Sequence, residues 1–149
     1  QILAIRDSVQ REDKDCKVLV MGDMNDDPMD KSISQGLHGK ANMSEVGQGD
    51  MYNPWYNVLT KEGVGTLQFQ GSWNLFDQIL LSKNLLNANG SKDYSTLKYW
   101  KNQIFKRDYL FQTEGKYKGT PKRTTAGGVW LDGFSDHLPV VVYLVKEKE

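Results

Sequence analysis

The chain has 149 residues, of which 38% are hydrophobic and 26% charged, a composition that fits one globular domain with a sizeable core and excludes a disordered chain. Nineteen basic residues balance nineteen acidic ones, so a nucleic-acid partner would have to be held by a local patch of positive charge. The single cysteine, Cys16, excludes an internal disulfide framework, and no apolar run is long enough to predict a membrane span.

The first half of the chain predicts a helix, a strand, a short helix and a long loop. Apolar residues recur at helical spacing among charged ones near the N-terminus and predict an amphipathic helix: Ile2, Ile5 and Val9. The continuously apolar run 18–21 predicts a central strand buried on both faces. A short helix should begin near residue 30 and end at Gly36 or Gly39, and residues 40–66 are interpreted as irregular loop because they are rich in glycine.

The second half predicts two further strands, near Phe76 and Leu138, and both are expected to be central in a mixed sheet together with the run 18–21. Residues 76–81 form an apolar run that Ser82 stops, and the Ser82 hydroxyl is expected to cap a short helix over 83–86. Residues 97–110 mix aromatics with lysines and carry no clear assignment. Residues 115–128 indicate a basic, glycine-bearing loop, and 138–145 predict the third strand.

Each apolar run carries an acidic group at one end. Asp23 and Asn25 follow the first run, Asp77 begins the second, and Asp136 and His137 precede the third. Side chains at strand ends can converge on one cleft from distant parts of a sequence. Acids gathered in this way need a cation or hydrogen-bond donors to offset their repulsion.

Three motifs at these positions resemble signatures of the endonuclease/exonuclease/phosphatase superfamily. Gly22-Asp23-Met24-Asn25 is similar to its G-D-F-N motif, Asp77-Gln78-Ile79 to its aspartate at a strand start, and Ser135 to Pro139 to its S-D-H-x-P motif. All three occur in the family's order. The wider stretch 65–82 looks like the bacterial branch of the family.

The resemblance implies a particular fold and extent. It covers nearly the whole of 1–149 but matches only the second half of the family domain, so the early asparagine and the principal metal-binding glutamate of the first half have no counterpart. A complete domain is a four-layer α/β/β/α sandwich. This chain is therefore expected to be α/β, with one mixed β-sheet carrying helices on one face. The other face should be apolar and covered by the missing half or by a second copy of the chain.

The resemblance also assigns roles at the site. Asp23 would orient or deprotonate the attacking water, and Asn25 would donate to a phosphate oxygen. His137 would face the phosphate while Asp77 holds its other nitrogen. Asp136 would contribute to a site for Mg2+ or Mn2+, hard cations that accept oxygen ligands and neutralise charge on a phosphoryl group. Trp73 and Asn74 would line the cleft rim and contact the substrate.

Each assignment has a structural alternative. Asp23 and Asn25 favour turns after strands, Asp77 could be a strand-edge charge, and Trp73 or His137 could be packed in a core. His38 is expected to be non-catalytic. Two groups of charges are interpreted first as solvated surface: the acidic group Asp26, Asp27 and Asp30, and the basic group Lys116, Lys118, Lys122 and Arg123.

Two classes of function follow. The first is a metal-dependent phosphoesterase acting on phosphodiester or phosphomonoester bonds, nuclease-like or phosphodiesterase-like, with little activity expected from these residues alone. The alternative is a non-catalytic half-domain used for binding or assembly. The chain begins at Gln1 without a signal-like segment, which predicts an N-terminus made by cleavage or cloning and leaves a cytoplasmic or a periplasmic or secreted location open.

Overall fold

The structure is a computed structural model that describes residues 1–88 and 91–148. Two α-helices are present in this part of the chain, α1 (Ile2–Glu12) and α2 (Trp55–Glu62). The π-helical turn η1 (Ser32–Gly36) and three 3-10 turns add short helical segments: η2 (Met43–Glu45), η3 (Lys83–Leu85) and η4 (Asp108–Leu110). The strands are β1 (Leu19–Asp23), β2 (Gly39–Lys40), β3 (Met51–Tyr52), β4 (Leu67–Phe69), β5 (Ser72–Asn74), β6 (Asp77–Ser82), β7 (Lys98–Ile104), β8 (Thr125–Ala126), β9 (Val129–Trp130) and β10 (Val140–Val145).

Four strands form the main sheet, in the order β1-β6-β3-β2. The pair β2–β3 is parallel, and β6 runs antiparallel to both of its neighbours, so the sheet is mixed. The other strands form three antiparallel pairs, β7–β10, β4–β5 and β8–β9. The predicted α/β class with a mixed sheet is confirmed.

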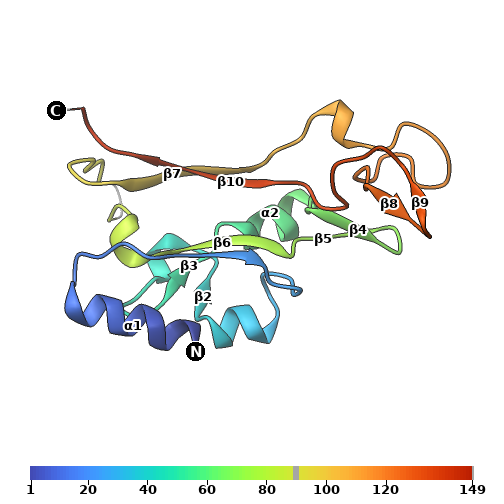
Figure 1. Cartoon of the computed structure of the whole chain (residues 1–149). Helices are drawn as coiled ribbons and strands as arrows, with labels where there is room; N and C mark the ends of the chain where they lie inside the picture. The colour runs from blue at the N-terminus through green and yellow to red at the C-terminus, as the bar shows by residue number, and fades with distance from the viewer. Residues whose placement is uncertain (89–90, 149) are drawn as a thin grey trace.

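The β7–β10 pair forms a second layer over the main sheet (Figure 1). Successive residues of a strand point to opposite faces, so Ile79 and Leu80 of β6 separate the two sides. Ile79 packs with α2 and with the β7–β10 pair, whereas Leu80 packs on the side of α1. The two helices therefore lie on opposite faces of the sheet, where the sequence predicts helices on one face.

Strand β6 is the centre of the core. Its last five residues are all buried, and it supplies a side chain to each of the three apolar clusters. The cluster nearest the Asp77 end contains Trp55, Leu75 and Ile79, with the Trp55 indole N–H donating to the Ile79 carbonyl at 3.1 Å. The predicted central position of the run 76–81 is confirmed.

The other two predicted central strands occupy different positions. β1 is the edge strand of the main sheet, and Met21 is 65% exposed, so the prediction of a strand buried on both faces is wrong. Its neighbour on one side only is β6, which leaves Leu19 and Met21 uncovered. β10 lies in the separate pair with β7, outside the main sheet.

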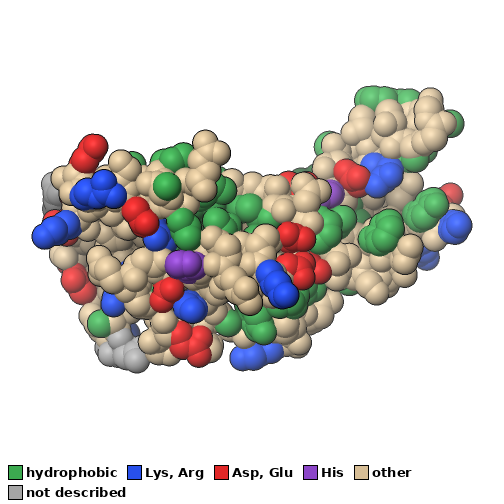
Figure 2. Space-filling view, turned by 90° about the horizontal axis from the view of Figure 1, so that it is seen from below, with side chains coloured by type: hydrophobic (Ala, Val, Ile, Leu, Met, Phe, Trp, Pro, Cys, Tyr) green, Lys and Arg blue, Asp and Glu red, His purple; other side chains and the backbone are tan. Residues whose placement is uncertain are grey.

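Helix α1 turns its predicted apolar stripe outward. Ile2, Ile5 and Val9 are exposed, while Arg6 is buried and its guanidinium donates to the Gly49 carbonyl at 2.6 Å. Leu3 makes the helix's contact with the core beside Leu80. Figure 2 views the molecule from this side and shows hydrophobic side chains between charged ones. The predicted helix is confirmed, but the spacing of its apolar residues does not identify the side of the helix that is buried.

The stretch 40–66 is not an irregular loop throughout. It contains β3 and α2, and the whole segment 51–55 is buried. Pro54 stands at the start of α2, and Gly63 ends it with a left-handed φ of 66°. Proline at a helix start and glycine after its end are ordinary helix boundaries, so the same two residues that suggested a loop delimit a helix.

Smaller expectations also meet the structure. The short helix after Pro28 is confirmed as η1, which ends at Gly36. The segment 97–110 supplies β7, and the basic loop ends in β8. Ser82 precedes η3 but does not cap it, because its hydroxyl accepts the Val18 N–H at 2.9 Å and donates to Asn84 instead. None of the described helices has the length and apolar character needed to cross a membrane.

Candidate functional site

Asp23 and Asp77 are direct cross-strand partners. Asp23 is the last residue of β1, Asp77 is the first of β6, and the antiparallel register places them opposite each other. Two like charges at facing positions of an antiparallel pair destabilise it unless a donor or cation lies between them. The sheet therefore places an acidic pair at one end that requires a third group.

His137 supplies that group. Its Nδ1 atom lies 2.8 Å from Oδ2 of Asp77 and 3.9 Å from Oδ2 of Asp23. Because a carboxylate accepts and does not donate, Nδ1 carries the hydrogen and Nε2 is left available for chemistry. The side chains of Asp77, His137 and Asp23 are 20%, 23% and 42% exposed, so the group opens to solvent on the Asp23 side.

Thr66 joins the two chain segments that carry this group. It is fully buried, its carbonyl accepts the N–H of Leu138 at 2.8 Å, and its hydroxyl is 3.5 Å from the N–H of Asp77. The Ser135 hydroxyl accepts the His137 N–H at 3.0 Å. These contacts fix His137 beside Asp77. Sequence reasoning missed Thr66, since a lone threonine in a glycine-rich stretch gives no distinguishing signal.

Asn25 is brought to the group through its backbone. Its N–H donates to Oδ1 of Asp23 at 2.9 Å, and its φ of 53° is left-handed, a conformation that asparagine tolerates. This turn orients the Asp23 carboxylate with Oδ2 toward His137. The turn that was given as the structural alternative for Asp23 and Asn25 is therefore present, and it directs the Asp23 carboxylate toward His137.

Asp136 points to a different partner. Its Oδ2 atom lies 2.7 Å from Nη2 of Arg123, and both side chains are about half exposed, at 52% and 50%. The carboxylate is therefore ion-paired next to the Asp23, Asp77 and His137 group. Arg123, interpreted from sequence as part of a solvated basic run, is the residue that holds it.

Trp73 and Asn74 lie on β5, close to the start of β6. Asn74 donates its amide to Oδ2 of Asp27 at 2.8 Å, and the Leu75 N–H donates to Oδ1 of the same residue at 2.6 Å. Asp27 thus anchors the loop after β1 to the chain before β6. Trp73 is half-buried, with the Lys106 ammonium 5.8 Å from its ring.

A buried amide network supports the site from behind. Gln78 donates to the carbonyls of Asp26 and Leu75 at 2.8 and 3.0 Å, and its own oxygen accepts from Asn53 at 2.8 Å. Asn53 and Gln78 are both almost fully buried, so these bonds are made away from water and hold the geometry firmly. Sequence reasoning did not identify this network, because its two amides lie 25 positions apart.

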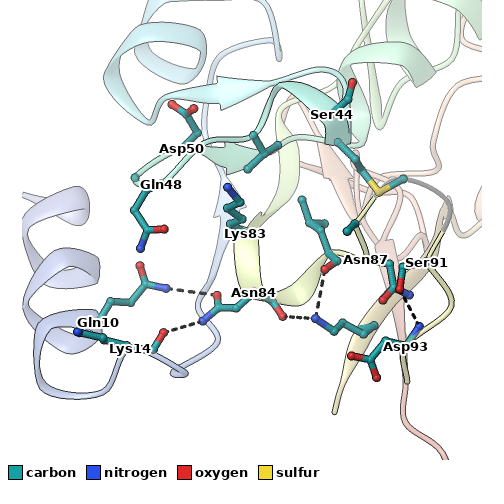
Figure 3. A pocket seen from close by; sticks show the side chains of 16 residues that line it. Gln10, Lys14, Ser44, Gln48, Asp50, Lys83, Asn84, Asn87, Ser91 and Asp93 are labelled. Carbon is teal, nitrogen blue, oxygen red and sulfur yellow. Dashed lines mark hydrogen bonds between the residues drawn. The ribbon is translucent and has the colours of Figure 1, made fainter. Parts of the chain in front are cut away.

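A cavity lies away from these residues. It has a volume of about 520 Å³ and is found at the Ser82 end of the sheet, where Lys83 and Asn84 line it (Figure 3). Lys98 closes one side by donating to the carbonyls of Asn84 and Leu86. The cavity contains none of the predicted site residues, and His38 likewise lies apart from them, its ring 3.3 Å from the Gly49 carbonyl.

The donor set does not complete a metal centre. Within residues 1–88 and 91–148, no group of three His, Cys, Asp or Glu side chains is arranged to hold a metal ion. Asp23 retains one carboxylate oxygen away from its turn, while Asp136 is engaged with Arg123. Mg2+ usually keeps several water ligands and takes one or two protein carboxylates, so Asp23 and Asp136 are the described side chains that would hold it.

Comparison with known proteins gives one match. A family model described as "Endonuclease/Exonuclease/phosphatase family" matches residues 2–146. No curated protein and no solved structure matches the chain. The matched range includes all of the residues that surround His137.

Proposed function

The chain belongs to the Endonuclease/Exonuclease/phosphatase family, a family of nuclease-type and phosphatase-type hydrolases, and on that premise we propose that it hydrolyses phosphoester bonds at Asp23, Asp77 and His137. The observation that carries the proposal is the placement of His137 between two facing carboxylates, at 2.8 Å and 3.9 Å. A histidine oriented by a carboxylate, with a second carboxylate beside it, is suited to positioning water and transferring protons.

Each residue has a distinct part in the proposed reaction. Asp77 accepts the Nδ1 hydrogen of His137 and so fixes the tautomer and the orientation of the ring. Nε2 then faces a phosphoryl oxygen and donates to it when the ring is protonated. Asp23, the most exposed of the three, holds the attacking water and takes its proton as the water oxygen bonds to phosphorus. The bond from phosphorus to the leaving oxygen breaks in the same step, and the leaving oxygen takes a proton from solvent.

Asn25 and Asp136 complete the proposal. The Asn25 side chain follows the turn at Asp23 and would donate to the phosphate. Asp136 would serve a divalent cation, Mg2+ or Mn2+, after exchanging its bond to Arg123. Such an ion, when bound, would neutralise charge on the phosphoryl oxygens. The remaining ligands would come from water and, in this proposal, from a further segment of a family domain.

The exposed apolar surface supports such a joining segment. Leu19 and Met21 of β1 are exposed on the face of the sheet that carries the β7–β10 pair, because they stand opposite Leu81 and Ile79, whereas Ile2, Ile5 and Val9 are exposed on α1, on the other face. We infer that the first half of a family domain, or a second copy of the chain, covers the exposed residues of β1. Size-exclusion chromatography with light scattering distinguishes a self-associated chain from a monomer that needs a different segment.

The substrate is proposed as a phosphodiester or phosphomonoester. Trp73 is half-buried with Lys106 near its ring, which supports a rim position where an aromatic can contact a substrate. Asn74 is bonded to Asp27, so its proposed contribution is to position the rim as well as to contact the substrate.

The experiment is a hydrolysis assay on the chain and on any longer form of the protein. Nucleic acid, phospholipid and bis(p-nitrophenyl) phosphate are offered with Mg2+, with Mn2+ and with chelator. We expect little turnover by the 149 residues alone, and metal-dependent turnover once the apolar surface is covered and the ligands are complete. A folded, fully covered protein that hydrolyses none of these substrates would favour the alternative of a non-catalytic binding or assembly module.

A further inference from the structure

Residues 106–134 form a projecting lobe built from two adjacent hairpin-like loops. Gln112 and Thr120 close the first loop through an N–H to carbonyl bond of 2.8 Å. The second is the β8–β9 hairpin, whose turn residues Gly127 and Gly128 both have positive φ, 55° and 80°, as a tight two-residue hairpin turn requires. Figure 1 shows this lobe at the end of the molecule beyond β4 and β5.

The lobe exposes large apolar side chains without forming a core. Val129, Trp130 and Phe134 are 60%, 66% and 64% exposed, and Tyr109 and Tyr117 are exposed as well. Within the lobe, every residue of which the structure describes, Pro121 alone is buried. Exposed apolar side chains gathered on one lobe in this way indicate an interaction surface.

The lobe also carries positive charge in a chain that is neutral overall. It contains six basic and three acidic residues, whereas the whole chain has nineteen of each. Arg123 pairs with Asp136, while Lys116 and Lys118 lie on the first loop beside Tyr117. Figure 2 shows hydrophobic side chains gathered at this end of the molecule with Lys and Arg side chains among them. The surface thus offers apolar groups and cations together.

We propose that the lobe docks onto the surface of an anionic lipid bilayer. Trp130 has the amphipathic ring that favours the membrane–water interface, and Val129 beside it extends the apolar tip. Lys116 and Lys118 attract anionic headgroups. Nucleic acid is the alternative occupant, because the Trp130 ring also has a face on which a base can stack; the exposed aliphatic Val129 beside it favours the lipid surface.

The docked orientation would place the candidate site near the bilayer. Phe134, the last residue of the lobe, donates its N–H to the Lys122 carbonyl at 2.8 Å and stands three positions before His137. The Arg123–Asp136 ion pair joins the base of the lobe to the same segment. Docking itself does not depend on the proposed hydrolysis, and its test needs no turnover.

The experiment measures co-sedimentation with vesicles of phosphatidylcholine, with and without phosphatidylserine. We expect binding that needs phosphatidylserine and falls with added salt. Trp130→Ala should weaken it roughly tenfold or more, since a large apolar side chain no longer enters the interface. Trp100→Ala is the matched control, because Trp100 is 56% exposed on β7, outside the lobe, and this variant should bind as the unaltered chain does.

Three further measurements complete the test. Brominated lipid should quench tryptophan fluorescence in the chain and in Trp100→Ala, but much less in Trp130→Ala. The double variant Lys116→Gln, Lys118→Gln should lose most of the dependence on phosphatidylserine. His137→Ala should bind vesicles normally, so lost hydrolysis and lost docking are separable. Circular dichroism confirms that each variant folds.

Other outcomes overturn the proposal. Absence of sedimentation by the folded chain would exclude the lipid surface. An equal loss in Trp100→Ala and Trp130→Ala would show a non-specific apolar contact. Binding to a DNA oligonucleotide that Trp130→Ala weakens, without any vesicle binding, would assign the lobe to nucleic acid instead.

Discussion

Asp77 and His137 stand 60 positions apart in the chain, yet a 2.8 Å contact joins their side chains. Asp77 begins the central strand β6, and His137 lies just before β10, which belongs to the layer above the main sheet. The contact therefore forms only when the β7–β10 pair is seated on β6. It connects the integrity of the fold directly with the geometry of the candidate site.

The Asp77–His137 contact predicts the tautomer of His137. Nitrogen NMR of the imidazole should show the Nδ1-protonated form of the neutral ring, because Asp77 can only accept at that position. Asp77→Leu, which removes the acceptor, should shift the ring toward the Nε2-protonated form that histidine otherwise favours. His38 is the only other histidine and serves as the internal control. An unchanged His137 tautomer in Asp77→Leu would contradict the assignment.

Substitutions at the site should reduce turnover more than stability. These variants are measured in a form of the protein that shows metal-dependent turnover. There, Asp23→Asn and His137→Ala should each lower kcat by roughly 100-fold or more, the scale for loss of a positioned base or electrostatic group. Both side chains are partly solvated, so the thermal midpoint should change little. His38→Ala is the control and should retain full activity. Activity of Asp23→Asn near that of the unaltered protein would remove Asp23 from the mechanism.

Trp55 should be the most sensitive tryptophan for stability. It is fully buried against Leu75 and Ile79, and its indole donates to the Ile79 carbonyl at 3.1 Å. Trp55→Phe leaves a cavity and a carbonyl without its donor, so urea unfolding should show a loss of about 2–4 kcal/mol. The exposed Trp100, changed to Phe, should lose less than about 0.5 kcal/mol. Equal losses for the two variants would place Trp55 outside the core.

Alkaline pH should destabilise the fold through Tyr99. Burial raises the pKa of the Tyr99 hydroxyl above its ordinary value of 10.0, and the same cause raises the pKa of Tyr52, whose ring lies 5.3 Å away. The folded state therefore holds these protons more tightly than the unfolded state. The resulting stability is complete below pH 10 and is lost progressively as the pH rises above it.

Thermal unfolding from about pH 9 to pH 11 measures this effect. Tyr99→Phe should show a shallower loss of stability above pH 10 than the unaltered chain. Tyr117→Phe, at an exposed position, should keep the original slope. If stability falls with pH at the same rate in all three proteins, Tyr99 does not cause the loss of stability at alkaline pH.

The parts of this fold that the sequence predicts are those with local causes. The run 76–81 is continuously apolar because both faces of β6 are covered, so periodicity identified it correctly. The run 18–21 is also continuously apolar. Its burial would need a further strand on the side of β1 that faces away from β6, and in this structure β1 is an edge strand. The apolar content of a segment therefore predicts that it forms a strand, but it does not predict whether other elements cover that strand.

In the candidate site, too, some residues could be proposed from the sequence and others could not. Its acids could be proposed from sequence because each stands at one end of an apolar run and within a recognisable motif. Thr66, Asn53 and Gln78 were missed, since their contribution comes from tertiary contacts that no spacing announces. The ion pair of Asp136 with Arg123 was also beyond prediction, because it depends on how residues 122–134 fold back on themselves.

The open edge of β1 allows the main sheet to be extended beside the candidate site. Among the residues that the structure describes, β1 pairs with β6 alone, so its outer edge offers backbone groups to a further strand. Such a strand would lie about 4.8 Å from β1 and would bring its own side chains beside Asp23. The same event would cover Met21, which is now mostly exposed. Extension of the sheet along this edge would therefore also change the surroundings of the candidate site.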